Sequence, residues 1–105
     1  MKLLNKKQDM FKPLDPILHS ELRLSILNIL INEKSAEFSS IKEITGSSSG
    51  NVSIQLKKLE AAGYIDLKKN FKGSYPLTTC KPTRKGIKAF EAYCVAIKDY
   101  LKIRK

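Results

Sequence analysis

The side chains best suited to chemistry lie between residues 47 and 65, where amide, hydroxyl and cationic groups recur on one side of an expected helix. At about 100° per residue, Val52, Leu56 and Leu59 form an inward seam. The outward face holds Gly50, Asn51, Ile54, Lys57, Lys58 and Ala61, flanked by Ser53 and Gln55. Amides pair with base edges, an aliphatic side chain fits a thymine methyl group, and lysines neutralise phosphates. We therefore expect this face to contact the major groove of DNA.

A helix-turn-helix is expected to present this face. The preceding residues predict a short helix that starts after an N-cap at Ser39 or Ser40 and stops at Gly46, because glycine commonly ends helices. Ser48 or Ser49 is then expected to cap the next helix, whose free backbone N–H groups can hold a phosphate. Two helices joined by a short turn that contains glycine form the helix-turn-helix unit.

The flanking segments predict a first helix and a basic hairpin. Between residues 14 and 31, aliphatic side chains fall on more than one side of a helix, which is typical of a central element. Residues 64–69 and 77–81 are rich in strand-forming side chains and are separated by turn chemistry at 70–76. On or near this hairpin lie Lys68, Lys69, Lys72 and Lys81. Three helices followed by a basic hairpin is the element order of a winged helix.

The last helix is expected to start after Thr83 and to run to about Ile103. Its apolar side chains form two adjacent rows, one of Ile87, Phe90, Cys94, Ile97 and Leu101 and one of Ala89, Tyr93, Ala96 and Tyr100. Two adjacent rows on a terminal helix leave surplus apolar surface that a subunit interface would cover. We therefore favour a homodimer over the alternative, in which one wide face packs wholly inside the monomer.

The 105 residues form one small domain, and its formal net charge of +10 is unevenly distributed. Residues 1–13 carry a small positive excess and residues 14–46 a small negative one, whereas residues 47–105 hold thirteen basic groups against four acidic ones. A positive excess on and beyond the outward-facing helix is expected of a protein that binds a polyanion. The alternative is a basic surface that is simply solvated.

The remaining composition argues against other classes of protein. No apolar run has the length of a secretory core or a membrane span, so we expect a cytoplasmic protein without a membrane partner. Cys80 and Cys94 lack metal-motif spacing and His19 is the single histidine, so neither a metal site nor a cofactor is expected. Thiol redox sensing through an exposed Cys80 is a minor alternative. No nucleophile–base pair or phosphate-binding glycine loop indicates an enzyme.

Together these segments resemble the compact winged-helix transcriptional regulators of the MarR-like and ArsR-like group. The resemblance rests on LHSELRLSILNIL for the first helix, FSSIKEITGSSSGNVSIQLKKLEAAGYI for the helix-turn-helix and first strand, and KPTRKGIKAFEAY for the return strand and final helix. It covers roughly residues 14–100. The specific features are the start Gly50-Asn51-x-Ser53, the exit LKKLEAAGYI and the step Thr83-x-x-Gly86.

The resemblance implies a homodimer that places two outward-facing helices in successive major grooves, with the hairpin wings on the flanking backbone. Carried over by position, the DNA-facing set is Ser48, Ser49, Asn51, Ser53, Ile54, Gln55, Lys57 and Lys58, with Lys68, Lys69 and Lys72 of the wing on phosphates. The apolar rows give an expected dimerisation set of Ile87, Phe90, Tyr93, Cys94, Ile97, Tyr100 and Leu101. The wing tip lacks the arginines common in the family, so we expect phosphate contact there rather than minor-groove insertion.

The sequence therefore predicts a mainly α-helical fold with a small β-hairpin. A basic arm or short helix at 1–13 precedes a winged helix-turn-helix at 14–82 and a C-terminal dimerisation helix at 83–105. We expect a homodimeric, sequence-specific regulator of transcription, more readily a repressor than an activator, that reads double-stranded DNA with helix 49–62 and grips the backbone with the wing at 64–82. The alternative is a winged-helix protein-interaction module or transcription-machinery accessory without sequence-specific DNA binding. The residues identify no effector.

Overall fold

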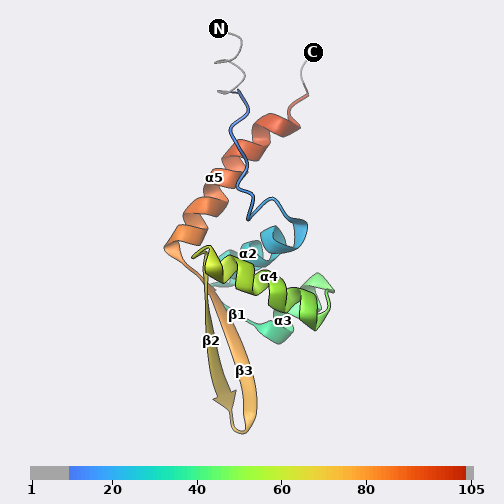
Figure 1. Cartoon of the computed structure of the whole chain (residues 1–105), viewed down its shortest axis with the longest axis vertical. Helices are drawn as coiled ribbons and strands as arrows, with labels where there is room; N and C mark the ends of the chain where they lie inside the picture. The colour runs from blue at the N-terminus through green and yellow to red at the C-terminus, as the bar shows by residue number, and fades with distance from the viewer. Residues whose placement is uncertain (1–9, 104–105) are drawn as a thin grey trace.

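The computed structural model describes residues 10–103, which form a helical domain with a small antiparallel sheet (Figure 1). In chain order the elements are α2 (Glu21–Glu33), β1 (Ala36–Glu37), α3 (Phe38–Thr45), α4 (Ser49–Ala61), β2 (Ile65–Lys72), β3 (Tyr75–Pro82) and α5 (Arg84–Leu101). This order confirms the expected winged helix. The arm or short helix expected at 1–13 falls mostly outside the described residues. None of the helices in the described part of the chain combines the length and apolarity that a membrane span requires.

The helices α2, α3 and α4 gather in the middle of the molecule, while the β2–β3 hairpin and α5 project toward opposite ends (Figure 1). The sheet has the order β1-β3-β2, and both pairs of strands are antiparallel. At its base, Cys80 on β3 lies opposite Ala36 on β1 and Leu67 on β2. Beyond that base the hairpin has no third strand, so it stands out from the domain as the wing, residues 65–82.

The core lies where α2, α3, α4 and the base of the sheet meet. Its fully buried side chains are Leu18, Ile26, Leu27, Leu30, Ile41, Val52, Leu56, Leu59, Ile65 and Cys80. The inward seam of α4 is thereby confirmed, since all three of its aliphatic residues are buried. Each buried aliphatic side chain contributes about 1.5–3 kcal/mol. The seam therefore fixes the rotation of α4 about its axis, and with it the set of side chains that face outward.

The first helix is shorter than expected, because residues 14–20 form a capped turn and not the start of the helix. The Asp15 carboxylate accepts a hydrogen bond from the N–H of Ile17 at 2.8 Å, and the carbonyl of the same residue accepts two more from the chain that follows. Ser20 then caps α2 by accepting from the N–H of Arg23 at 3.4 Å. Such a turn satisfies the N–H groups that a helix would leave open, so apolar spacing alone does not reveal it.

The start of α3 also differs from the expectation, whereas its end agrees. The helix begins at Phe38 with Glu37 as its N-cap and without a side-chain cap bond, so the caps expected at Ser39 or Ser40 are wrong. The strand β1 leads directly into the helix and already sets the extended conformation of the N-cap residue. Gly46 ends α3 as expected, with a left-handed φ of +68° that glycine adopts without strain.

The wing is longer than expected, because β2 extends to Lys72 and β3 begins at Tyr75, within the range 70–76 for which the sequence predicts a turn. Only Gly73 and Ser74 form the turn, between the paired residues Lys72 and Tyr75. Gly73 has a φ of +66°, which suits the first central position of a two-residue hairpin loop. Asparagine and proline usually signal turns, but both are tolerated here in the exposed part of a two-stranded ribbon.

Hydrogen bonds join the start of α5 to the residues that follow α4. The Thr83 hydroxyl accepts from the N–H of Gly86 at 3.0 Å, which confirms the expected cap, and donates to the carbonyl of Gly63 at 2.6 Å. The N–H of Thr83 donates to the carbonyl of Tyr64 at 3.0 Å. A Cβ on Gly86 would lie 2.1 Å from that same carbonyl oxygen, so only glycine fits this approach. The helix ends at Leu101, two residues earlier than expected.

Candidate nucleic-acid interface

The helix α4 is held at both ends as well as along its inner face. At its start, the Ser48 hydroxyl accepts from the N–H of Asn51 at 3.2 Å, which confirms the expected cap. At its end, Gly63 takes a left-handed φ of +80° and donates its N–H to the carbonyl of Glu60 at 2.9 Å. The helix ends one residue earlier than the expected position 62. These contacts make α4 a rigid support for the side chains on its outer face.

The outer face of α4 is open to solvent over most of its length. The exposed members of the expected DNA-facing set are Ser48, Ser49, Asn51, Ile54, Lys57 and Lys58, and the half-buried ones are Ser53 and Gln55. Ile54 leaves 54% of its surface exposed among polar neighbours. A single exposed apolar side chain is normal on a protein surface, so the polar and cationic groups around Ile54 carry the interpretation of this face. The fold therefore brings the expected set together on one side of one helix.

Gln55 is held by two neighbours on its own chain. The guanidinium of Arg23 donates from Nη1 to Gln55 Oε1 at 2.6 Å, and Gln55 Nε2 donates to Asn51 Oδ1 at 3.0 Å. Arg23 also donates from Nε to the carbonyl of Ile17 at 2.6 Å. Sequence reasoning missed this arginine, although it is the only lysine or arginine between residues 14 and 33. Its partner lies 32 positions away, which no local pattern indicates.

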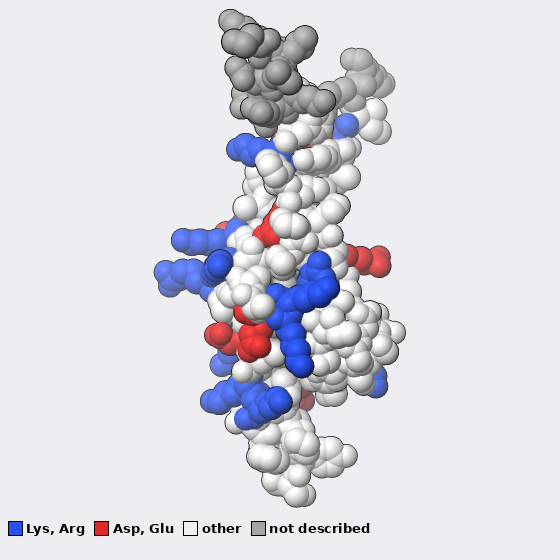
Figure 2. All heavy atoms as spheres, in the orientation of Figure 1, with Lys and Arg blue, Asp and Glu red and all other residues white. Residues whose placement is uncertain are grey.

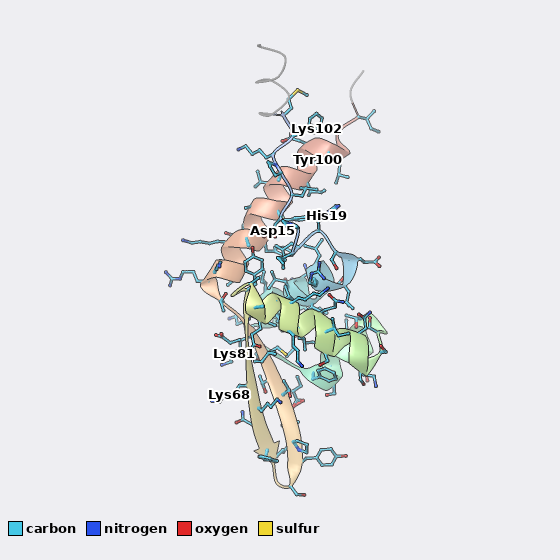
Figure 3. All side chains as sticks on the ribbon, in the orientation of Figure 1. Asp15, His19, Lys68, Lys81, Tyr100 and Lys102 are labelled. Atoms are coloured by element: carbon cyan, nitrogen blue, oxygen red, sulfur yellow. The ribbon has the colours of Figure 1, made fainter. Side chains whose placement is uncertain are left out.

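The chain before α2 links the end of α4 to α5. The Tyr64 hydroxyl donates to the Asp15 carboxylate, and burial together with this hydrogen bond and the carboxylate charge raises the pKa of Tyr64 to about 12. Nδ1 of His19 lies 3.0 Å from the hydroxyl of Tyr93 on α5. Farther along α5, Tyr100 donates its hydroxyl to a main-chain carbonyl of this chain segment at 2.7 Å. Figure 3 shows Asp15, His19 and Tyr100 along this path.

The wing lysines do not all share one face. Directly opposed residues of an antiparallel pair project to the same side, and successive residues alternate. Lys81 shares a face with Lys68 and Lys72, because its partner on β2 is two residues before Lys68 (Figure 3). Lys69 continues the row of the buried Ile65 on the other face. The expected site grouped Lys69 with the wing lysines and left out Lys81, since the strand register was not available from the sequence.

Basic side chains gather over α4, along one side of the wing and around the start of α5 (Figure 2). The tip of the wing shows none in the same view. It instead exposes two aromatic side chains, Phe71 and Tyr75, on either side of the turn. On the side of the molecule shown in the figure, basic side chains thus lie over α4 and the proximal wing, with acidic side chains beside them near the base of the wing.

The expected dimerisation residues occupy three different environments. Tyr93 is buried, with 7% of its surface exposed. The half-buried ones are Ile87, Phe90, Cys94 and Ile97. The exposed ones are Tyr100 and Leu101, which lie at the far end of α5. Exposed apolar side chains collect at that end, where Val95, Tyr100, Leu101 and Ile103 are found. Surplus apolar surface is therefore present, but it lies toward the end of the helix more than along its whole length.

Cys80 does not meet the requirement of the redox alternative, which needs an exposed thiol. Its side chain is buried at the base of the wing, and burial raises its pKa to about 11. A buried thiol held in its protonated form is a poor nucleophile, so the burial of Cys80 argues against the minor redox alternative. Within residues 10–103, no group of three or more His, Cys, Asp and Glu side chains is placed to hold a metal ion.

Comparison with known sequences identifies a family for most of the chain. Residues 22–101 match the family described as "Winged helix DNA-binding domain". An uncharacterized protein of Methanocaldococcus jannaschii is 36% identical over 81 residues, which is 77% of this chain and 88% of that protein. The matched region includes the whole of α3, α4, the wing and α5.

Comparison with solved structures gives the same fold. The transcriptional regulator homologue protein from Pyrococcus horikoshii OT3 has a TM-score of 0.78 at 24% identity, and the match covers 96% of this chain and 95% of that one. A mutant of Escherichia coli MarR in complex with operator DNA has a TM-score of 0.70 at 17% identity, covering 95% of this chain and 72% of that one. At these identities the likeness shows a shared fold.

Proposed function

We propose that this chain, which belongs to the winged helix DNA-binding domain family and has the fold of MarR-like transcriptional regulators, is a sequence-specific regulator of transcription. It binds double-stranded DNA as a homodimer and represses by occupying its operator. The observation that carries the proposal is the outer face of α4, where exposed amide, hydroxyl and cationic groups surround a 54% exposed isoleucine. An interaction module would instead present large apolar side chains over most of this face.

The roles on α4 follow from the position and chemistry of each side chain. Asn51, Ser53 and Ile54 lie on the side that enters the major groove, where they meet base edges and thymine methyl groups. Lys57 and Lys58 lie farther along the helix and neutralise phosphates. The exposed residues at the start of α4 offer backbone N–H groups to a phosphate at the positive end of the helix dipole.

The wing adds contacts with the phosphates of the DNA backbone. Lys68, Lys72 and Lys81 share one face of the hairpin, so they approach the same stretch of phosphates. Each phosphate neutralised releases counterions and steepens the salt dependence of binding, without adding preference for any base. The structure of Escherichia coli MarR with operator DNA supports a role of this fold in DNA binding.

A second copy of the chain covers the exposed end of α5. Leu101 leaves 71% of its surface exposed, and further apolar side chains surround it at this end. A twofold axis there pairs two α4 helices, and a symmetric dimer reads a pseudo-palindromic site.

The proposal is tested by selecting bound fragments from random duplex DNA with the full chain, together with size determination in solution. We expect an enriched palindrome and a dimer. Enrichment of a single half-site by a monomer would refute the dimer. Binding without any enriched sequence, or no binding, would overturn the regulator and favour the protein-interaction module.

A further inference from the structure

Arg23, Gln55 and Asn51 form a hydrogen-bonded relay that runs from α2 to the outer face of α4. We propose that Arg23 is a positioning residue, which fixes through Gln55 the side of the Asn51 amide that meets the bases. The inference rests on the proposed function, because it concerns how α4 reads DNA. It assigns a role to an arginine outside the expected DNA-facing set.

The direction of each hydrogen bond in the relay follows from the arginine. A guanidinium only donates hydrogen bonds, so the amide atom of Gln55 that lies 2.6 Å from Arg23 must be the oxygen. The NH₂ group of Gln55 therefore faces Asn51 and must donate. Asn51 has to accept with Oδ1, which lies 3.0 Å away. The oxygen and nitrogen of an isolated amide are interchangeable in orientation, whereas here one cation fixes both amides.

Because the relay engages the oxygen of the Asn51 amide, its NH₂ group is the one that remains available on the exposed surface. Guanine, adenine and thymine all present an acceptor in the major groove, whereas the edge of cytosine presents only its N4 amino donor. An Asn51 oriented in this way disfavours cytosine at the base it contacts. The amide of Gln55, engaged at both ends, contributes to reading indirectly.

Arg23 is itself held in place. Its Nε donates to the carbonyl of Ile17 at 2.6 Å, and its Nη2 lies 3.5 Å from the carbonyl of Pro16. Both carbonyls belong to the capped turn that Asp15 organises before α2. Each nitrogen of the guanidinium thus has one partner on the protein, and a charge-assisted hydrogen bond to Gln55 is stronger than one between neutral groups. An arginine anchored in this manner orients its neighbours.

The decisive variant is Gln55→Glu. The new carboxylate keeps its pairing with Arg23 but has no donor for Asn51, so the Asn51 amide must turn over and donate its NH₂ group inward. Its oxygen then faces the bases and favours a donor. We expect cytosine to rise at the contacted position by about fivefold or more relative to guanine and thymine, the lower bound of a specific base contact. Adenine is not the reference, because its N6 amino group also offers a donor in the major groove. The contacted position is the one at which Asn51→Ala abolishes base preference.

The second variant is Arg23→Met, which keeps the length of the side chain and removes all donors. Both amides are then free to turn over, so discrimination at the same position should fall by about fivefold or more while other positions keep their preference. Binding to random duplex should fall no more than in Lys57→Gln, the control that removes the same unit of charge without touching the relay. Base preference separates this role from a purely structural one, which would lower all affinities together.

Selection from random duplex DNA with each variant gives the readout, and thermal unfolding shows that each is folded. If the wild type enriches a motif and Gln55→Glu leaves every position unchanged, the relay is overturned while the regulator stands. If Arg23→Met fails to fold, Gln55→Glu alone decides, because it retains the cation and its partner. If the wild type enriches no motif, the proposed function is overturned and the inference with it.

Discussion

Replacing Gly86 by alanine should loosen the junction that sets where α5 leaves the domain. The added Cβ would lie 2.1 Å from the carbonyl oxygen of Tyr64, although real Cβ atoms essentially never approach another heavy atom within 3.0 Å. The crowded atoms belong to the main chain and not to the end of a flexible side chain. Two backbone segments must therefore separate by about 1 Å, a displacement that a well-packed interior resists.

The cost of Gly86→Ala can be assembled from three terms. Overpacking costs about 1–3 kcal/mol, and the upper end applies because backbone must move. The separation also weakens the hydrogen bond from the Thr83 N–H to the Tyr64 carbonyl, which contributes about 1 kcal/mol. In the opposite direction, alanine stabilises the helix by about 1 kcal/mol relative to glycine. The free energy of unfolding should therefore fall by about 3 kcal/mol, which lowers Tm by about 15 °C in a domain of this size.

Urea and thermal unfolding at one fixed protein concentration measure this loss, because the Tm of a dimer depends on concentration. Gly50→Ala is the matched control, since Gly50 also lies in the first turn of a helix but has no atom within 4 Å of a new Cβ. The free energy of unfolding of Gly50→Ala should rise by up to about 1 kcal/mol. A Gly86→Ala protein as stable as the wild type would refute the reasoning about the close approach.

Three further outcomes follow from exposure and burial. Leu101→Glu should convert the dimer to a folded monomer in sedimentation experiments, since 71% of this side chain is exposed in the single chain; an unchanged dimer would move the interface elsewhere. A thiol reagent should modify Cys94 before Cys80, because burial raises the pKa of Cys80 to about 11. Mass spectrometry gives the order of modification, and the reverse order would contradict the burial of Cys80. The pKa of Tyr64 is raised from 10.0 to about 12, so its neutral phenol contributes stability that is complete below pH 10 and is lost as the pH rises through about 12. Tyr64→Phe should remove this component of the alkaline loss in urea titrations, and an identical pH profile would argue against the Asp15 contact.

The sequence predicts the helical parts of this fold well because helical spacing reports burial directly. The seam on α4 has to be buried for the helix to pack, and its spacing can be read without any knowledge of the partner elements. The caps at Ser48 and Thr83 are equally local, since a hydroxyl reaches an N–H three residues ahead. The same locality explains why the outer face of α4 could be assigned residue by residue.

The parts that the sequence does not predict depend on contacts between distant residues or on competing local hydrogen bonds. Asp15 forms a turn where apolar spacing favoured a helix, because its carboxylate and carbonyl satisfy the following N–H groups. The strands of the wing extend to Lys72 and from Tyr75, because pairing across the hairpin outweighs the turn preference of single residues. The bond between Arg23 and Gln55 exists only after α2 and α4 have packed.

The length of the wing sets how much DNA the protein has to meet. Leu67 and Cys80 form the last pair that includes a buried side chain, and five further residues lead to Lys72 at the turn. At about 3.3 Å per residue, this projects the turn about 16 Å beyond the domain, close to half a helical turn of DNA. In the proposed mode of binding, a synthetic duplex trimmed to the bases that α4 reads would therefore lack the phosphates that the wing contacts. It would bind more weakly than a longer duplex while keeping the same preferred sequence. The measured affinity should therefore rise with the length of the duplex, whereas the preference among sequences should stay the same.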